Sequence, residues 1–270
     1  MIPKVAFVDV DGVRIHVQDL GDGPAVALVS GFGLDHELWD RQVRLLTDRG
    51  FRVLCVDQRG HGFSDTPLHG YDIDRLAADL VTALDRLEIG GATVVGHSFG
   101  GQVAFRAAAT APELVTGLVL VGSNGVRASR SESFPFGEPP GPLLQSLLAD
   151  EHANRVGARY RTIESAFAHE PDPRTVDWLV RCSLRMPSWA AVACYRSLLM
   201  TDLLADIERV IQPVLQIVGA NDPVHSAKGA RWLRRHLRAA TLVEIPDCGH
   251  YPRLVAPDAF ESALLKFITA

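Results

Sequence analysis

The sequence predicts an α/β fold with a mostly parallel central sheet, helices on both faces and one helical insertion. Apolar runs typical of strands buried on both faces alternate with amphipathic helical patterns along most of the chain. Hydrophobic residues make up 47% of the 270 positions, which is enough to bury a large core. Such alternation favours parallel strands joined by helical crossovers.

The strands are predicted from short apolar runs and the helices from apolar stripes. An N-terminal hairpin is expected where residues 4–10 and 13–18 alternate apolar and polar side chains around Asp11 and Gly12. Further strands are predicted at residues 25–30, 52–56, 92–96, 115–121, 214–218 and 241–245. Helices are predicted at residues 72–87, 99–111, 228–237 and 258–268.

Residues 127–200 interrupt this alternation because they contain no clear apolar strand. A proline- and glycine-rich loop at residues 134–142 precedes helical patterns at 143–161, 175–184 and 188–199. We therefore expect residues 1–126 and 201–270 to form the core, with residues 127–200 inserted as a helical lid. The lid would lie above the C-terminal edge of the sheet, where ligands bind in such folds.

Composition and charge exclude several classes of protein. The formal net charge is −5 and no Lys/Arg block occurs, which argues against a nucleic-acid partner or an anionic membrane surface. The four cysteines form neither a CxxC pair nor a Cys/His cluster, so no metal site is expected, and no cofactor. The N-terminus lacks signal-peptide features and no apolar run approaches the ~20 residues of a membrane span, so a cytoplasmic location is expected. The oligomeric state stays open.

Ser98 lies in the most informative motif. Gly96 and Gly100 flank it, a predicted buried strand precedes it and a predicted helix follows it. A strand-to-helix turn this sharp strains the serine backbone and needs small neighbours. It exposes the hydroxyl at a helix N-terminus, where the helix dipole favours developing negative charge. The motif therefore predicts a nucleophilic serine.

This motif, together with SGFG at residues 30–33 and DQRGHGFSD at residues 57–65, resembles the α/β-hydrolase superfamily. The resemblance extends from about Val13 to Ile268 and is weakest in the predicted lid. It implies that nucleophile, acid and base follow one another in that order along the chain.

Asp222 and His250 fit the acid and the base in that order. Asp222 follows the strand at 214–218, and the other position that the family uses for the acid, residues 122–125, has no carboxylate. His250 follows the strand at 241–245 and has the residue type suited to accept and return the serine proton. His97 and His61 compete with it; we expect His97 to pack away from the nucleophile and His61 to make a loop hydrogen bond.

Two backbone N–H groups are expected to form the oxyanion hole, those of Phe99 and Phe32. The resemblance implies the position of Phe32, although Ser30 stands where many relatives have histidine. The Phe32 ring is a candidate wall of the acyl pocket, with an ordinary core role as the alternative. Trp189 is the other candidate for the substrate pocket.

Other lid residues allow two interpretations. Arg155, Arg159 and Arg161 could meet an acidic substrate, but a solvated helix face is the favoured interpretation. Met186 and Met200 could line an apolar cavity, although helix packing is the commoner use of methionine.

The predicted function is hydrolysis of a carboxylic ester or lactone through an acyl-enzyme, with a small apolar substrate as partner. A serine at the turn excludes the aspartate-dependent epoxide hydrolases and haloalkane dehalogenases of this fold. The alternatives are C–C bond hydrolysis of diketone-like acids, cofactor-free haloperoxidase or perhydrolase chemistry, and acyl transfer. A different class, the hydrolase-like ligand sensor, stays open because Gly31-Phe32-Gly33-x-Asp35 resembles such proteins.

Overall fold

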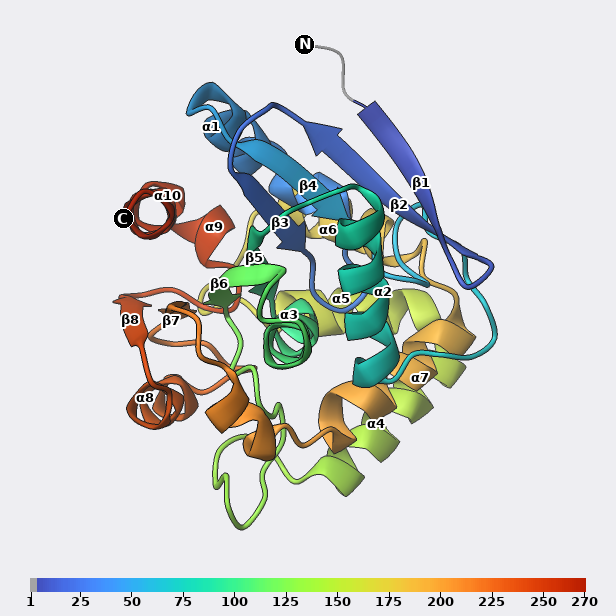
Figure 1. The fold of residues 1–270 in the computed structure, drawn as a ribbon. Helices are drawn as coiled ribbons and strands as arrows, with labels where there is room; N and C mark the ends of the chain where they lie inside the picture. Colours follow the sequence, from blue (N-terminus) through green and yellow to red (C-terminus); the bar gives the residue numbers. More distant parts are fainter. Residues whose placement is uncertain (1–3) are drawn as a thin grey trace.

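The computed structural model describes residues 4–270, which contain one eight-stranded sheet (Figure 1). The strands are β1 (Lys4–Val10), β2 (Val13–Leu20), β3 (Ala25–Val29), β4 (Arg52–Val56), β5 (Ala92–His97), β6 (Val115–Val121), β7 (Val214–Gly219) and β8 (Ala240–Ile245). Their order in the sheet is β1-β2-β4-β3-β5-β6-β7-β8. β1 pairs antiparallel with β2, and β2 pairs antiparallel with β4. All other neighbours in the sheet, from β4 through β3 to β8, are parallel.

The predicted fold class is confirmed, and every predicted strand is present with ends that agree to within two residues. Residues 1–3 of the predicted core lie outside the described residues. Because β3 to β7 are parallel, their carboxyl ends meet at one edge of the sheet. The loops that leave these ends carry Phe32, Ser98 and Asp222.

Helices cover both faces of the sheet (Figure 1). One layer contains α2 (Ile73–Arg86), α3 (Phe99–Thr110) and α8 (Ala227–His236), and the other contains α1 (Asp40–Asp48), α9 (Pro252–Val255) and α10 (Pro257–Ile268). The apolar stripe predicted for α2 is buried, and Asp72 caps its start by accepting a hydrogen bond from the amide of Arg75 at 2.9 Å. Each layer buries its own apolar cluster against the sheet.

Four helices lie between β6 and β7 in the chain: α4 (Pro140–Ala153), α5 (Arg155–Glu164), α6 (Pro173–Ser183) and α7 (Ser188–Met200). The single helix expected at 143–161 is wrong, because the chain breaks at Asn154 with φ −157° and ψ 85°. The Asn154 side chain accepts a hydrogen bond from the amide of Gly157 at 3.0 Å and so starts α5. A short polar side chain can cap a new helix as readily as continue an old one.

Several short elements escaped the sequence analysis. These are the 3-10 helices at His36–Trp39 and Leu204–Arg209, together with α1 and α9. Asp35 caps the first of them by accepting the amide of Glu37 at 3.1 Å. This turn matters because it shapes the loop that carries Phe32.

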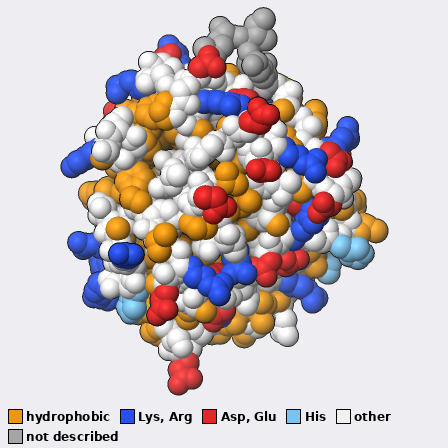
Figure 2. Space-filling view, viewed as in Figure 1, with side chains coloured by type: hydrophobic (Ala, Val, Ile, Leu, Met, Phe, Trp, Pro, Cys, Tyr) orange, Lys and Arg blue, Asp and Glu red, His pale blue; other side chains and the backbone are white. Residues whose placement is uncertain are grey.

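The surface agrees with the mild net charge. In the view of Figure 2, side chains of both signs are interspersed with apolar ones, and no broad area of a single sign appears. All four cysteines are buried and free, and Cys55 packs in an apolar cluster as a small apolar residue. Within residues 4–270, every helix is too short or too polar to cross a bilayer.

Candidate active site

Ser98 occupies a strained turn between β5 and α3. Its backbone has φ 53° and ψ −117°, a conformation that L-residues rarely adopt. The flanking glycines are required sterically: an added Cβ at Gly96 would lie 2.4 Å from the carbonyl oxygen of Gly100. One at Gly100 would lie 2.4 Å from the carbonyl oxygen of Ser30. The serine is therefore held at the N-terminus of α3 by a turn that admits only glycine two residues before and two residues after it.

Asp222 and His250 form a buried hydrogen-bonded pair. Nδ1 of His250 donates to Oδ2 of Asp222 at 2.9 Å, while Oδ1 accepts the amides of Val224 and His225 at 2.8 and 3.0 Å. Burial acts to raise the pKa of Asp222, but the charge and hydrogen bond of His250 and the amide of His225 outweigh it, so the pKa is lowered. The carboxylate thus stays ionised and holds the imidazole with its other nitrogen free.

The backbone of His250 is held from two further sides. Its amide donates to the carbonyl of Ala166 at 2.9 Å, and its carbonyl accepts Nε2 of His97 at 3.0 Å. Gly122 lies beside the pair, since an added Cβ there would be 3.2 Å from Nδ1 of His250. His97 is packed, as expected, with 1% of its surface exposed; its ring also lies 4.8 Å from that of His250 and lines the same cavity.

Ser98 and His250 open onto one cavity of about 80 Å³. Its remaining lining residues come from the loop after β3, from α5 to α7 and from loops at the sheet edge: Phe32, Leu34, His97, Arg159, Thr162, Ile163, Ala166, Ser183, Tyr195, Leu198, Val224 and Tyr251. The lining is mainly apolar. The structure therefore brings the predicted nucleophile and base to a common space, with Asp222 behind the base.

Phe32 follows β3 and lies against α7. Its ring lines the cavity and stacks on Tyr195, with 4.0 Å between ring centroids. Ser30, the departure from the family pattern, uses its hydroxyl to donate to the carbonyl of Asp35 at 2.7 Å, which closes the loop. At the start of α3, the N–H of Phe99 has no acceptor within its own helix.

Trp189 does not line this cavity. Its side chain is 49% exposed at the start of α7, and Tyr195, later in the same helix, lines the cavity instead. Met200 is 58% exposed, whereas Met186 is fully buried in the core. Among the described residues, Tyr195 is thus an aromatic lining residue that the sequence analysis did not single out. Two aromatic positions on one helix look alike until the packing of the helix is known.

A solvated face is the wrong interpretation for Arg159, which is only 1% exposed. Its Nε and Nη2 donate to the two carboxylate oxygens of Glu151 at 3.0 and 2.9 Å, and Nη1 donates to the hydroxyl of Ser183 at 2.8 Å. Arg155 is partly buried and donates to two backbone carbonyls, whereas Arg161, paired with Asp150, is exposed. Glu151, eight residues before Arg159, was the available signal for a buried pair.

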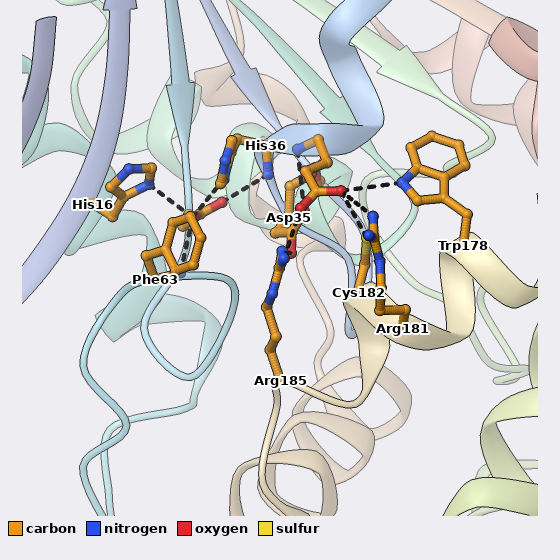
Figure 3. A network of polar contacts seen from close by, with 11 residues as sticks. His16, Asp35, His36, Phe63, Trp178, Arg181, Cys182 and Arg185 are labelled. Atoms are coloured by element: carbon orange, nitrogen blue, oxygen red, sulfur yellow. Dashed lines mark hydrogen bonds and ion pairs between the residues drawn. The ribbon is translucent and has the colours of Figure 1, made fainter.

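Ion pairs tie the loop after β3 to α6 (Figure 3). Arg185, just after α6, donates to Asp35 at 2.5 Å and to Glu37 at 2.6 Å. Glu37 also accepts Nε1 of Trp178 at 3.2 Å and a guanidinium N–H of Arg181 at 2.6 Å. The loop that carries Phe32 is therefore anchored to the helical insertion as well as to the sheet.

A second buried cluster in Figure 3 has the residue types of a metal site, and hydrogen bonds join its members. Nδ1 of His16 and Nδ1 of His36 lie 2.8 and 2.9 Å from Oδ2 of Asp57, which also accepts the amide of Phe63 at 3.1 Å. Burial acts to raise the pKa of Asp57, but these hydrogen bonds outweigh it and lower the pKa to about 2. An added Cβ at Gly62 would lie 2.1 Å from Oδ2, so the loop after β4 packs its backbone directly against this carboxylate. The cluster is a structural tie.

Two buried histidines make stability depend on pH. Burial lowers the pKa of His61 and of His225 from 6.5 to about 4. Between these values the unfolded chain binds protons that the folded chain rejects, so we expect the free energy of unfolding to fall as the pH drops from 6.5 towards 4. Urea unfolding at several pH values, in wild type and in His225→Leu, measures this. His225→Leu should lose less stability on acidification; an equal loss would contradict the assignment.

Known proteins share this fold over nearly the whole chain. A family model described as the alpha/beta hydrolase fold matches residues 24–257. The chain is similar to a pimeloyl-[acyl-carrier protein] methyl ester esterase of Nitrosomonas europaea, at 36% identity over 92% of this chain and 97% of the relative. It is also similar to 3-oxoadipate enol-lactonase 2 of Acinetobacter baylyi, at 29% identity over 90% of this chain and 88% of the relative. In fold it matches an esterase from Exiguobacterium antarcticum, with a TM-score of 0.95, 24% identity and full coverage of both chains. The chain belongs to the alpha/beta hydrolase family.

Proposed function

We propose that the protein is a serine hydrolase that cleaves a carboxylic ester through an acyl-enzyme. One observation carries the proposal: the strained Ser98 and the hydrogen-bonded Asp222–His250 pair meet at one mainly apolar cavity. Ser98 is the nucleophile, His250 is the general base and then the general acid, and Asp222 orients the imidazole.

Each step uses a feature of this site. His250 takes the proton of Ser98 as its hydroxyl attacks the ester carbonyl, and Asp222 stabilises the imidazolium that forms. The amides of Phe99 and Phe32 are the donors for the oxyanion, the first because it begins a helix. His250 then returns the proton to the leaving alcohol, and water releases the acyl group by the same route.

Residues 127–200 act in this proposal as a lid. In support, Arg159, Thr162 and Ile163 of α5 and Tyr195 and Leu198 of α7 line the cavity. A cover of this kind excludes bulk water, which strengthens the electrostatic interactions around the reacting groups.

An ester is the first choice of substrate because the relative at 36% identity is named as a methyl ester esterase. A lactone is the second, since another relative is named as an enol-lactonase and the chemistry at the acyl carbon is the same. A ligand sensor would instead release product in one slow burst and then stop, so multiple turnover of p-nitrophenyl esters separates the two classes.

An active-site probe tests the assignment directly. We expect an organofluorophosphonate to label Ser98 in the wild type, and His250→Ala to abolish nearly all labelling, because the hydroxyl is a weak nucleophile without its base. Labelled peptides are identified by mass spectrometry. His152→Ala, a change at an exposed histidine of α4, is the control and should label normally. Normal labelling of His250→Ala would assign the base to another residue.

A further inference from the structure

We propose that the site accepts short, uncharged acyl groups of up to about four carbons, and that the stacked rings of Phe32 and Tyr195 set this limit. The inference rests on the proposed function and names the substrate class of the same site. It follows from the size of the cavity, the rigidity of its aromatic wall and the pairing of its one charged residue.

The cavity is small for a hydrolase substrate. Its volume is about 80 Å³. An engineered cavity of about 150 Å³ holds a benzene, and pockets that enclose drug-sized ligands measure about 300–1,000 Å³. A chain of eight carbons therefore does not fit inside unless a wall moves. The leaving alcohol has a way out past Val224, which lines the cavity and is 41% exposed.

The aromatic wall joins the core to the helical insertion. Phe32 comes from the loop after β3 and Tyr195 from α7, and their rings are nearly parallel, with 23° between the planes. Tyr195 is 3% exposed, so moving it into solvent would disrupt the packing around it. A longer acyl chain on this side would have to separate the two rings.

Arg159 makes the wall rigid. Its guanidinium carbon lies 5.2 Å from the centre of the Phe32 ring, and the arginine is only 1% exposed. Glu151 and Ser183 hold its nitrogens, and an added Cβ at Gly33 would be only 3.1 Å from Nη1. Because these charges are buried and matched, moving the arginine aside would leave one of them unpaired.

The same pairing argues against a charged acyl group. Arg159 is the permanent cation among the described cavity residues, and both oxygens of Glu151 already accept from it. A substrate carboxylate would have to displace Glu151 or stay unpaired in an apolar space. An uncharged acyl group incurs neither cost.

The test measures kcat/KM for p-nitrophenyl acetate, butyrate and octanoate, and for the mono-p-nitrophenyl ester of succinic acid. In the wild type we expect octanoate to fall below butyrate by about 10- to 100-fold, since overfilling a packed site has a comparable cost. The succinate ester, which matches butyrate in length but carries a carboxylate, should fall below it by about tenfold or more.

Tyr195→Ala removes half of the wall and should raise the octanoate-to-butyrate ratio by about tenfold or more, with acetate little changed. Tyr195→Leu, which keeps a large apolar side chain in α7, should raise it less and guards against poor folding of the first variant. Trp189→Ala is the matched control, an aromatic-to-alanine change in the same helix but off the cavity, and should keep the wild-type ratio. Thermal unfolding confirms that each variant is folded.

Three outcomes overturn the inference: octanoate used as well as butyrate by the wild type, equal use of the succinate ester, or an unchanged ratio in both Tyr195 variants. These differ from failure of the proposed function. If the proposed function were wrong, the wild type would hydrolyse none of the esters, or its hydrolysis of them would not depend on Ser98.

Discussion

Replacing Ser98 by alanine is expected to lower kcat/KM for p-nitrophenyl butyrate by about 10⁴- to 10⁶-fold, which is the scale of losing the nucleophile in a serine hydrolase. The fold should survive, because alanine keeps the Cβ and meets the same backbone strain at φ 53° that serine already tolerates. Steady-state turnover, with thermal unfolding as the check on structure, measures both quantities.

The matched control is Ser165→Ala, an exposed serine that follows α5, which should keep kcat/KM within about twofold of wild type. If Ser98→Ala retained a tenth of the wild-type rate, the acyl-enzyme mechanism through Ser98 would be refuted.

Asp222→Asn is expected to lower kcat by about 10³- to 10⁴-fold with little effect on stability. An asparagine oxygen can still accept the amides of Val224 and His225. Its NH₂ group, however, would face Nδ1 of His250 and donate to it, which puts the imidazole proton on the nitrogen that must accept from Ser98. The base would then be in the wrong tautomer, and kcat would fall more than KM changes.

Asp247→Asn provides the comparison for that result. Asp247 is an exposed aspartate in the loop that carries His250, at φ 52°, a conformation that asparagine adopts readily. The Asp247→Asn variant should retain nearly full activity. Equal losses in the two variants would mean that both act by disturbing the loop, and the orienting role of Asp222 would be abandoned.

The sequence predicted the sheet well because its signals are local. A buried parallel strand such as β7 is apolar along its length, and the turn at Ser98 needs glycines at fixed positions, so both can be recognised without knowledge of the rest of the chain. The contact between Asp222 and His250 was also accessible, because each follows a strand of the same parallel sheet.

The helical insertion was less predictable because its side chains are sorted by tertiary packing. The helix expected at 143–161 breaks at Asn154, whose side chain caps α5 although the apolar pattern continues past it. Arg159 has the composition of a surface residue and is buried only because Glu151 and Ser183 meet it. Trp189 and Tyr195 share a helix, and only the rotation of α7 decides which of them faces the cavity.

The tight glycines around Ser98 have a consequence for how such a protein can diverge. At Gly96, Gly100 and Gly101 any side chain would collide with backbone or with the buried Ser123. We therefore expect substitutions at these positions to be eliminated during evolution. The helices after β6 line the cavity through side chains that can be exchanged one at a time, while the carbonyl of Ala166 in the loop after α5 holds the backbone of His250. Proteins that diverge from this chain would therefore keep the turn around Ser98 and change their substrate specificity through substitutions in the helical insertion.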